Sequence, residues 1–123
     1  MTDQGTAKRV LIVEDNPLLA YDLEDLIRDH GLEPVGPALD LQTGIMLARE
    51  NQLHGALLDI DLGEDRVWPL ARELKSHTVP FAFISAQCSG DMLPPEFADH
   101  DCIEKPAERE QIAATVTKLV GFD

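Results

Sequence analysis

Carboxylic acids crowd into one short stretch of the chain, "ALLDIDLGED" from Ala56 to Asp65. An apolar run leads directly into Asp59, and Asp61 follows two residues later. Two like charges about 4 Å apart repel by roughly 4 kcal/mol at an effective dielectric constant of about 20. A bound cation, a proton or exposure to water would offset this cost, and the residues elsewhere in the chain must decide among the three.

Short apolar stretches alternate with stretches of helical periodicity along the chain, which predicts an α/β fold with a mostly parallel sheet and helices on both faces. The expected strands are residues 8–14, 33–39, 54–59, 79–85 and 101–105. The expected helices are residues 17–30, 41–51, 67–77 and 107–121. Between residues 86 and 99 the pattern weakens around a glycine and two prolines, so a helix there is expected to be short or disordered.

Polar side chains stand where four of these strands end: Glu14 and Asp15, Asp59, Ser85, and Lys105. Ligands of parallel α/β sheets bind outside the carboxyl ends of the strands, so these side chains should meet in one shallow cleft. Three carboxylates form an oxygen-rich site suited to Mg²⁺ with retained waters. Asp59 would then be a nucleophile toward a phosphoryl group, while the metal and Lys105 neutralise the phosphoryl oxygens.

The same residues resemble the motifs of a receiver domain of two-component response regulators, in the order that this family has them. The matching stretches are "LIVEDNP", "ALLDIDLG", "FISA" and "IEKPA". The resemblance covers nearly the whole chain, from about Lys8 to Val120. It implies a (βα)5 flavodoxin-like fold with a five-stranded parallel sheet of order 2-1-3-4-5.

The resemblance also implies a role for each acid. Asp59 would be the phosphoacceptor, taking the group from a kinase phosphohistidine. Asp15 and Asp59 would ligate Mg²⁺ (or Mn²⁺) directly, together with the backbone carbonyl of Asp61. Glu14 would act on the metal largely through water.

On the other side of the cleft, the resemblance implies that Ser85, Ala86 and Lys105 bind the phosphoryl group and respond to it. The bond from Lys105 to Pro106 is usually cis in the family, which aims the lysine. The side chain of Gln87 would either tune dephosphorylation or remain a solvated loop residue. The side chain of Asp61 faces the same two alternatives.

Cys102 departs from the family pattern, because this position usually holds an aromatic residue that rotates when the hydroxyl moves. The usual coupling of aromatic and hydroxyl is therefore in doubt here. Cys88 and Cys102 have no CxxC spacing, and a cytoplasmic chain keeps its thiols reduced, so both are expected to be free. The stretch "PFAFISAQ" suggests a branch of stand-alone receivers with an irregular segment in place of the fourth helix.

The chain has 123 residues, which suits one domain, with residues 1–7 as a tail and 8–123 as the receiver domain. Its net charge of -13 makes nucleic acid and membrane surfaces poor partners. An N-terminus without an apolar core indicates a cytoplasmic protein. The expected partners are a sensor histidine kinase or histidine phosphotransfer protein and an unidentified downstream protein, reached by docking or phosphate relay without an output domain.

Two rival interpretations remain open at this point. A receiver-like interaction module that is never phosphorylated would use the same fold, but such modules usually lack a site residue, and none is lacking here. The "DID" of residues 59–61 also resembles the DxD of haloacid-dehalogenase-type phosphatases. That motif usually ends the first strand of its domain, whereas here it ends the third expected strand. A receiver accepts a phosphoryl group and is not a classical enzyme.

Overall fold

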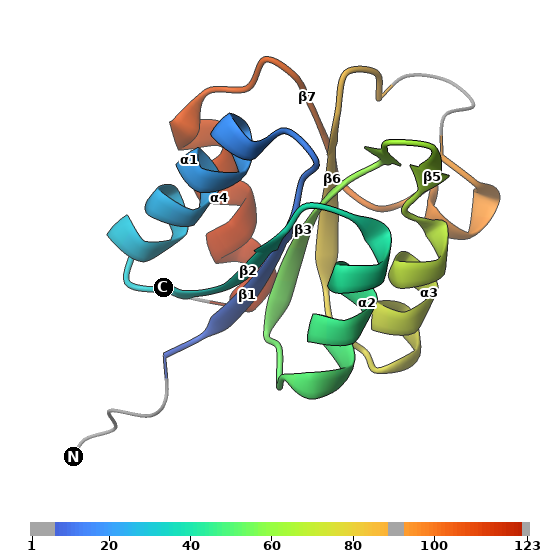
Figure 1. Cartoon of the computed structure of the whole chain (residues 1–123). Coiled ribbons are helices and arrows are strands. Elements are labelled where there is room, and N and C mark those ends of the chain that lie inside the picture. Colours follow the sequence, from blue (N-terminus) through green and yellow to red (C-terminus); the bar gives the residue numbers. More distant parts are fainter. Residues whose placement is uncertain (1–6, 89–92, 122–123) are drawn as a thin grey trace.

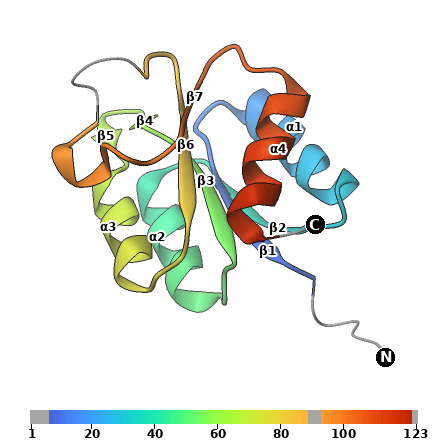
Figure 2. The same cartoon turned by 180° about the vertical axis from the view of Figure 1, so that it is seen from behind.

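The computed structural model describes residues 7–88 and 93–121. Its main element is a five-stranded parallel sheet in the order β2-β1-β3-β6-β7, which confirms the predicted flavodoxin-like topology. The strands are β1 (Arg9–Val13), β2 (Glu33–Ala38), β3 (Gly55–Asp59), β6 (Phe81–Ser85) and β7 (Cys102–Glu104). The helices are α1 (Pro17–Asp29), α2 (Leu41–Glu50), α3 (Trp68–Ser76) and α4 (Arg109–Val120). Helices α1 and α4 cover one face of the sheet, and α2 and α3 cover the other (Figures 1 and 2).

The sheet separates two apolar cores, because successive side chains of a strand point to opposite faces. In β1, Val10 and Ile12 pack in the core beneath α1 and α4. Leu11 and Val13 pack in the other core, beneath α2 and α3. All four are fully buried, so β1 reads as a continuous apolar run, as a strand covered on both faces must.

Helices α1 and α2 begin at residues whose side chains cap them. Asn16 accepts hydrogen bonds from the amides of Leu18 and Leu19 through its side chain, and Pro17 occupies the first turn of α1. Asp40 accepts a hydrogen bond from the amide of Thr43, 2.7 Å away, at the start of α2. These caps fix where the chain leaves β1 and β2, and so they fix the positions of the residues between strand and helix.

The chain between β6 and β7 contains one short helical turn in its described part, the 3-10 turn η2 (Pro95–Phe97). Residues 89–92 of the expected irregular stretch lie outside the described residues. Phe97 is fully buried and stacks on Trp68, with ring centroids 5.8 Å apart. Arg72 of α3 donates two hydrogen bonds to Glu96, so the turn is fastened to α3.

A small antiparallel pair of strands, β4 (Asp61–Leu62) and β5 (Asp65–Arg66), lies between β3 and α3. This pair was not predicted from the sequence. The strands are two residues long, which is too short for a periodic pattern of apolar residues to appear. The ladder folds the acidic stretch back on itself directly after Asp59.

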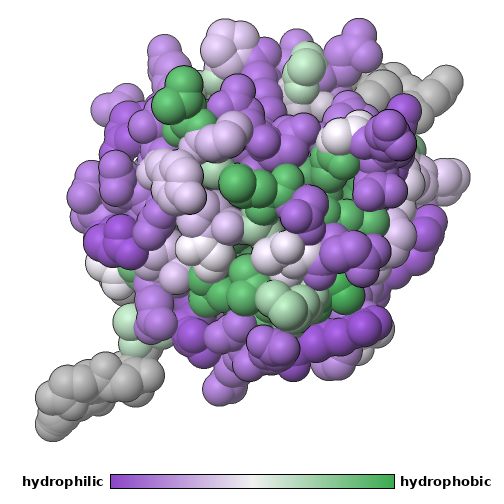
Figure 3. All heavy atoms as spheres, viewed as in Figure 1, coloured by the Kyte–Doolittle hydropathy of each residue, from purple (hydrophilic) through white to green (hydrophobic). Residues whose placement is uncertain are grey.

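The surface is strongly acidic, and hydrophilic side chains cover most of the face seen in Figure 3. Every arginine of the chain forms an ion pair with a carboxylate. The pairs are Arg9–Glu33, Arg28–Glu24, Arg49–Glu73, Arg66–Asp61, Arg72–Glu96 and Arg109–Asp29. Within residues 7–88 and 93–121, none of the helices has the length and apolar character that crossing a bilayer requires.

Candidate functional site

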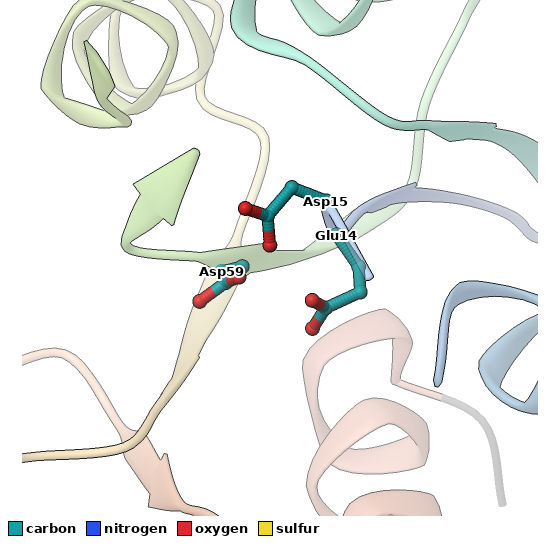
Figure 4. Close-up of side chains that lie close together, drawn as sticks. All are labelled: Glu14, Asp15 and Asp59. Carbon is teal, nitrogen blue, oxygen red and sulfur yellow. The ribbon is translucent and has the colours of Figure 1, made fainter. Parts of the chain in front are cut away.

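Three carboxylates meet at the carboxyl edge of the sheet, as the strand ends predict. Glu14 and Asp15 follow β1, and Asp59 ends β3, the neighbouring strand (Figure 4). Each offers an oxygen within 4.8 Å of the others. Glu14 is fully buried and Asp59 is only 4% exposed, while Asp15 is exposed. This burial excludes simple exposure to water as the explanation for the crowding at Asp59.

Backbone amides hold two of these carboxylates in place. The amide of Asn16 donates to Oε2 of Glu14 at 3.0 Å. The amide of Gly63 donates to Oδ2 of Asp15 at 3.2 Å, from the turn between β4 and β5. Gly63 has φ +68°, a left-handed conformation that glycine adopts without steric cost. The unpredicted ladder therefore presents an amide to the acidic site.

Lys105 brings a positive charge to the carboxylates from the loop that follows β7. Its Nζ lies 2.9 Å from Oε1 of Glu14 and 3.5 Å from Oδ2 of Asp59. Burial lowers the pKa of Lys105, but the hydrogen bond to Glu14 and the charges of Asp59 and Glu14 outweigh it and raise the pKa above its ordinary value. The lysine is thus charged beside the acids, and its peptide bond to Pro106 is cis.

Asp59 is the most strongly perturbed acid of the site. Burial and the negative charge of Glu14 raise the pKa of Asp59 from 3.8 to about 8, although Lys105 opposes the shift. Without a metal the carboxyl therefore holds a proton near neutral pH. A divalent cation fits here, because three oxygen donors converge and a double positive charge would displace that proton.

The remaining predicted site residues lie around this centre. Ser85 ends β6 and is buried, and its Oγ accepts a hydrogen bond from the amide of Gln87 at 3.3 Å. Ala86 and the side chain of Gln87 are exposed. The Asp61 side chain is also exposed and forms an ion pair with Nε of Arg66 at 2.9 Å. Its carboxylate is therefore engaged across the β4–β5 ladder.

The expectation that both cysteines are free is wrong: Cys88 and Cys102 form a disulfide, with Cα atoms 5.7 Å apart. The cysteines are 14 residues apart in sequence, and nothing in that spacing indicates proximity. They meet because β6 and β7 are neighbours and Cys102 begins β7. The chain after Ser85 turns toward the strand that carries the second cysteine.

No protein-family model matches the chain. The phyllosphere-induced regulator PhyR of Methylorubrum extorquens is 32% identical over 126 residues, covering 94% of this chain and 45% of PhyR. The solution structure of SdrG from Sphingomonas melonis Fr1 is 29% identical, with a TM-score of 0.78, over 93% of this chain and 97% of SdrG.

The solution structure of the receiver domain of the PhyR response regulator from Erythrobacter litoralis is also similar, at 25% identity and a TM-score of 0.78. It covers 95% of this chain and 92% of that domain. The chain is a response regulator receiver domain. It spans about half the length of the curated relatives it matches, at 45% of each.

The groups that orient the acids of this receiver domain were not predicted from the sequence. These groups are the amides of Asn16 and Gly63 and the ion pair of Asp61 with Arg66. Their positions depend on backbone geometry, which the residue types alone do not indicate. One signal was available for Gly63, since a glycine followed by the polar residues Glu64 and Asp65, just after an expected strand, indicates a turn. No comparable signal existed for the partner of Cys88.

Proposed function

We propose that this receiver domain accepts a phosphoryl group on Asp59 from a phosphohistidine. An Oδ atom of Asp59 attacks the phosphorus, the phosphorus–nitrogen bond breaks, and its electron pair returns to the imidazole of the donor. The product is an aspartyl phosphate. Hydrolysis by water later releases inorganic phosphate and restores the carboxylate, at a rate that the side chains of Asp61 and Gln87 are candidates to tune.

The position of Lys105 carries this proposal. Its ammonium group lies within 3.5 Å of Asp59 and is charged, so it can neutralise phosphoryl oxygens as negative charge shifts in the transition state. A lysine that served only to balance the charge of the acids would need no contact beyond Glu14, whereas Lys105 lies near both Glu14 and Asp59. Ser85 ends the neighbouring strand β6 and Ala86 follows it. The Ser85 hydroxyl and the Ala86 amide are the proposed further contacts to the phosphoryl group.

Asp15, Asp59 and the backbone carbonyl of Asp61 are the proposed ligands of Mg²⁺ (or Mn²⁺), with Glu14 acting largely through water. The bound cation would neutralise phosphoryl charge and keep Asp59 ionised. In its absence the raised pKa leaves Asp59 protonated near neutral pH, and a protonated carboxyl is a poor nucleophile. Phosphorylation should therefore depend on the metal.

The proposed donor is a sensor histidine kinase or a histidine phosphotransfer protein, acting in the cytoplasm. A downstream protein would read the phosphorylated state by docking, or receive the phosphate by relay. The receiver fold and the relatives favour this function over a dehalogenase-type phosphatase. The experiment below distinguishes this function from that of an interaction module that is never phosphorylated.

The experiment is phosphate uptake from a small donor. The protein is incubated with acetyl phosphate and Mg²⁺ and run on a phosphate-affinity gel, beside Asp59→Asn and the control variant Glu64→Gln. Glu64 belongs to the same acidic stretch but is exposed and lies outside the three-carboxylate cluster. A shifted, alkali-labile band in the wild type and in Glu64→Gln, absent from Asp59→Asn and from samples with EDTA, is expected.

A band that persists in Asp59→Asn would place the phosphate elsewhere and overturn the assignment of Asp59. No band with acetyl phosphate, and none with a phosphorylated histidine kinase as donor, would leave the interaction module as the function of the domain.

A further inference from the structure

The Cys88–Cys102 disulfide lies beside the phosphoryl-binding side of the site and is within reach of solvent. Both cysteines are half-buried, so an external thiol can approach either sulfur. Cys88 stands three residues after Ser85, and Cys102 stands three residues before Lys105. The bridge therefore joins the two segments that lead to the proposed hydroxyl and ammonium groups of the site.

Hydrogen bonds extend this connection from the bridge to Ser85. The amide of Cys88 donates to Oε1 of Glu104 at 3.3 Å, which ties the segment to β7 a second time. The amide of Gln87, one residue earlier, donates to Oγ of Ser85 at 3.3 Å. The amide of Lys105 donates to the carbonyl of Ser85 at 2.8 Å. Any displacement of Cys88 thus reaches the Ser85 hydroxyl through a single intervening residue.

We propose that the Cys88–Cys102 pair is a redox-sensitive site that controls how long Asp59 stays phosphorylated. The inference rests on the proposed function of Asp59 as phosphoacceptor. With the disulfide closed, Gln87 is held where its amide donates to Oγ of Ser85 and fixes the orientation of that hydroxyl. With the disulfide open, the segment from Ala86 to Cys88 is released, and the hydroxyl turns toward the phosphoryl oxygens.

The redox step is an ordinary thiol–disulfide exchange with a dithiol reductant. A thiolate of the reductant attacks one sulfur of the bridge, the sulfur–sulfur bond breaks, and a mixed disulfide forms. The second thiolate of the reductant then attacks the reductant's own sulfur in the mixed disulfide, the bond to the protein sulfur breaks, and the reductant leaves as its internal disulfide. Two electrons and two protons have passed to Cys88 and Cys102, which are now thiols. A disulfide oxidant reverses the sequence.

The proposed cytoplasmic location favours a switching role over a purely structural one. Reducing compartments keep most thiols free, and disulfides that form there are usually transient and sense the redox state. The pair is also placed where a switch has an effect. The bridge closes around the η2 turn, which Phe97 and Arg72 already fix to α3, so opening it acts mainly on the segment after Ser85.

The test measures the lifetime of the aspartyl phosphate in both redox states. Oxidised wild type and wild type reduced with dithiothreitol under nitrogen are phosphorylated with acetyl phosphate and Mg²⁺. The donor is removed, and the remaining phosphorylated fraction is followed on a phosphate-affinity gel. The double variant Cys88→Ser, Cys102→Ser is the matched control because it cannot form the bridge. Thiol alkylation and mass spectrometry verify the redox state of each sample.

The half-life is expected to lengthen about three- to tenfold on reduction, the effect of one added hydrogen bond to the phosphoryl group. The double variant should match the reduced wild type with or without dithiothreitol. Equal half-lives of the oxidised and reduced wild type would overturn the proposal.

Hydrogen exchange of the Gln87 and Cys88 amides separates this proposal from the proposed function. If no form takes up phosphate, the proposed function of Asp59 fails, and the exchange rates decide whether the bridge controls the segment. Faster exchange of both amides in the reduced protein would support that control. Unchanged exchange would overturn it, whatever the phosphorylation result.

Discussion

The β1–β3 side of the site and its β6–β7 side are positioned by different kinds of bond. On the first side, the backbone amides of Asn16 and Gly63 hold the carboxylates of Glu14 and Asp15, which follow the buried strand β1. On the second side, a disulfide and one side-chain carboxylate hold the segment after Ser85. Backbone amides change only when the fold changes, whereas a disulfide changes with the redox state of its surroundings. With the proposed redox role of the disulfide, the site combines a fixed acidic half (Glu14, Asp15 and Asp59) with an adjustable half (the segment after Ser85 and the Cys88–Cys102 bridge).

The largest expected effect concerns the fixed half. Asp59→Asn should stabilise the metal-free protein by on the order of 3 kcal/mol at neutral pH, because the buried carboxyl no longer has to take up a proton on folding. Urea unfolding in EDTA measures the difference, with Glu64→Gln as the control that should change little. A variant less stable than the wild type would contradict the account of crowded carboxylates.

Mg²⁺ should reduce the difference in the free energy of unfolding between Asp59→Asn and the wild type. If Asp59 ligates the metal as proposed, Mg²⁺ should stabilise the folded wild type increasingly as its concentration rises, while the variant has lost one proposed ligand. Unfolding curves at a series of Mg²⁺ concentrations measure this. Equal responses of both proteins would show that Asp59 does not take part in binding the metal.

The disulfide of the adjustable half should contribute less to the free energy of unfolding. Reducing the Cys88–Cys102 bridge, which closes a loop across 14 residues of sequence, should lower the free energy of unfolding by about 3 kcal/mol at most. Urea unfolding with and without dithiothreitol measures the loss. The double variant Cys88→Ser, Cys102→Ser should show no response to the reductant, and a response there would mean that dithiothreitol acts elsewhere.

The pH dependence sharpens the contrast between the two halves. The folded pKa of Asp59 is raised, so its stabilising contribution is complete below about pH 4 and is lost as the pH rises toward about 8. The metal-free protein should lose up to about 1.4 kcal/mol per pH unit within this window. Asp59→Asn should flatten the dependence of the free energy of unfolding on pH. Reduction of the disulfide should lower the whole profile without changing its slope.

The smallest expected effect concerns Gly63, whose amide orients Asp15. A Cβ there meets open space, but φ is +68°, so Gly63→Ala should cost about 1 kcal/mol from backbone strain alone. Gly63→Asn is the matched control, because asparagine tolerates this conformation better. Chemical unfolding compares the three proteins. A larger loss for asparagine than for alanine would point to crowding instead of strain.

The sequence predicts the sheet and the acidic half of the site because both follow from local patterns. Apolar runs that end in Glu14 and Asp59 define strands and place their last residues at one edge of the sheet. Asn16 and Asp40 are residue types that favour a helix N-cap, and the following helices begin there. These signals lie within a few residues of the features that they predict.

The adjustable half could not be predicted in the same way. Whether Cys88 meets Cys102 depends on the path of the chain between β6 and β7, and the composition of that stretch does not determine the path. The assumption of a reducing compartment then pointed to the wrong answer. The β4–β5 ladder was missed because each strand has only two residues, and with it the link from Gly63 to Asp15 was missed.

The ion pairs on the surface have a kinetic consequence. Because every arginine is matched by a neighbouring carboxylate, the field felt at a distance comes from the surplus of acids behind the net charge of -13. Such a field speeds the diffusional encounter with a basic surface and slows it with an acidic one. The association rate of a basic docking partner should therefore fall steeply as salt is added, while its dissociation rate changes little.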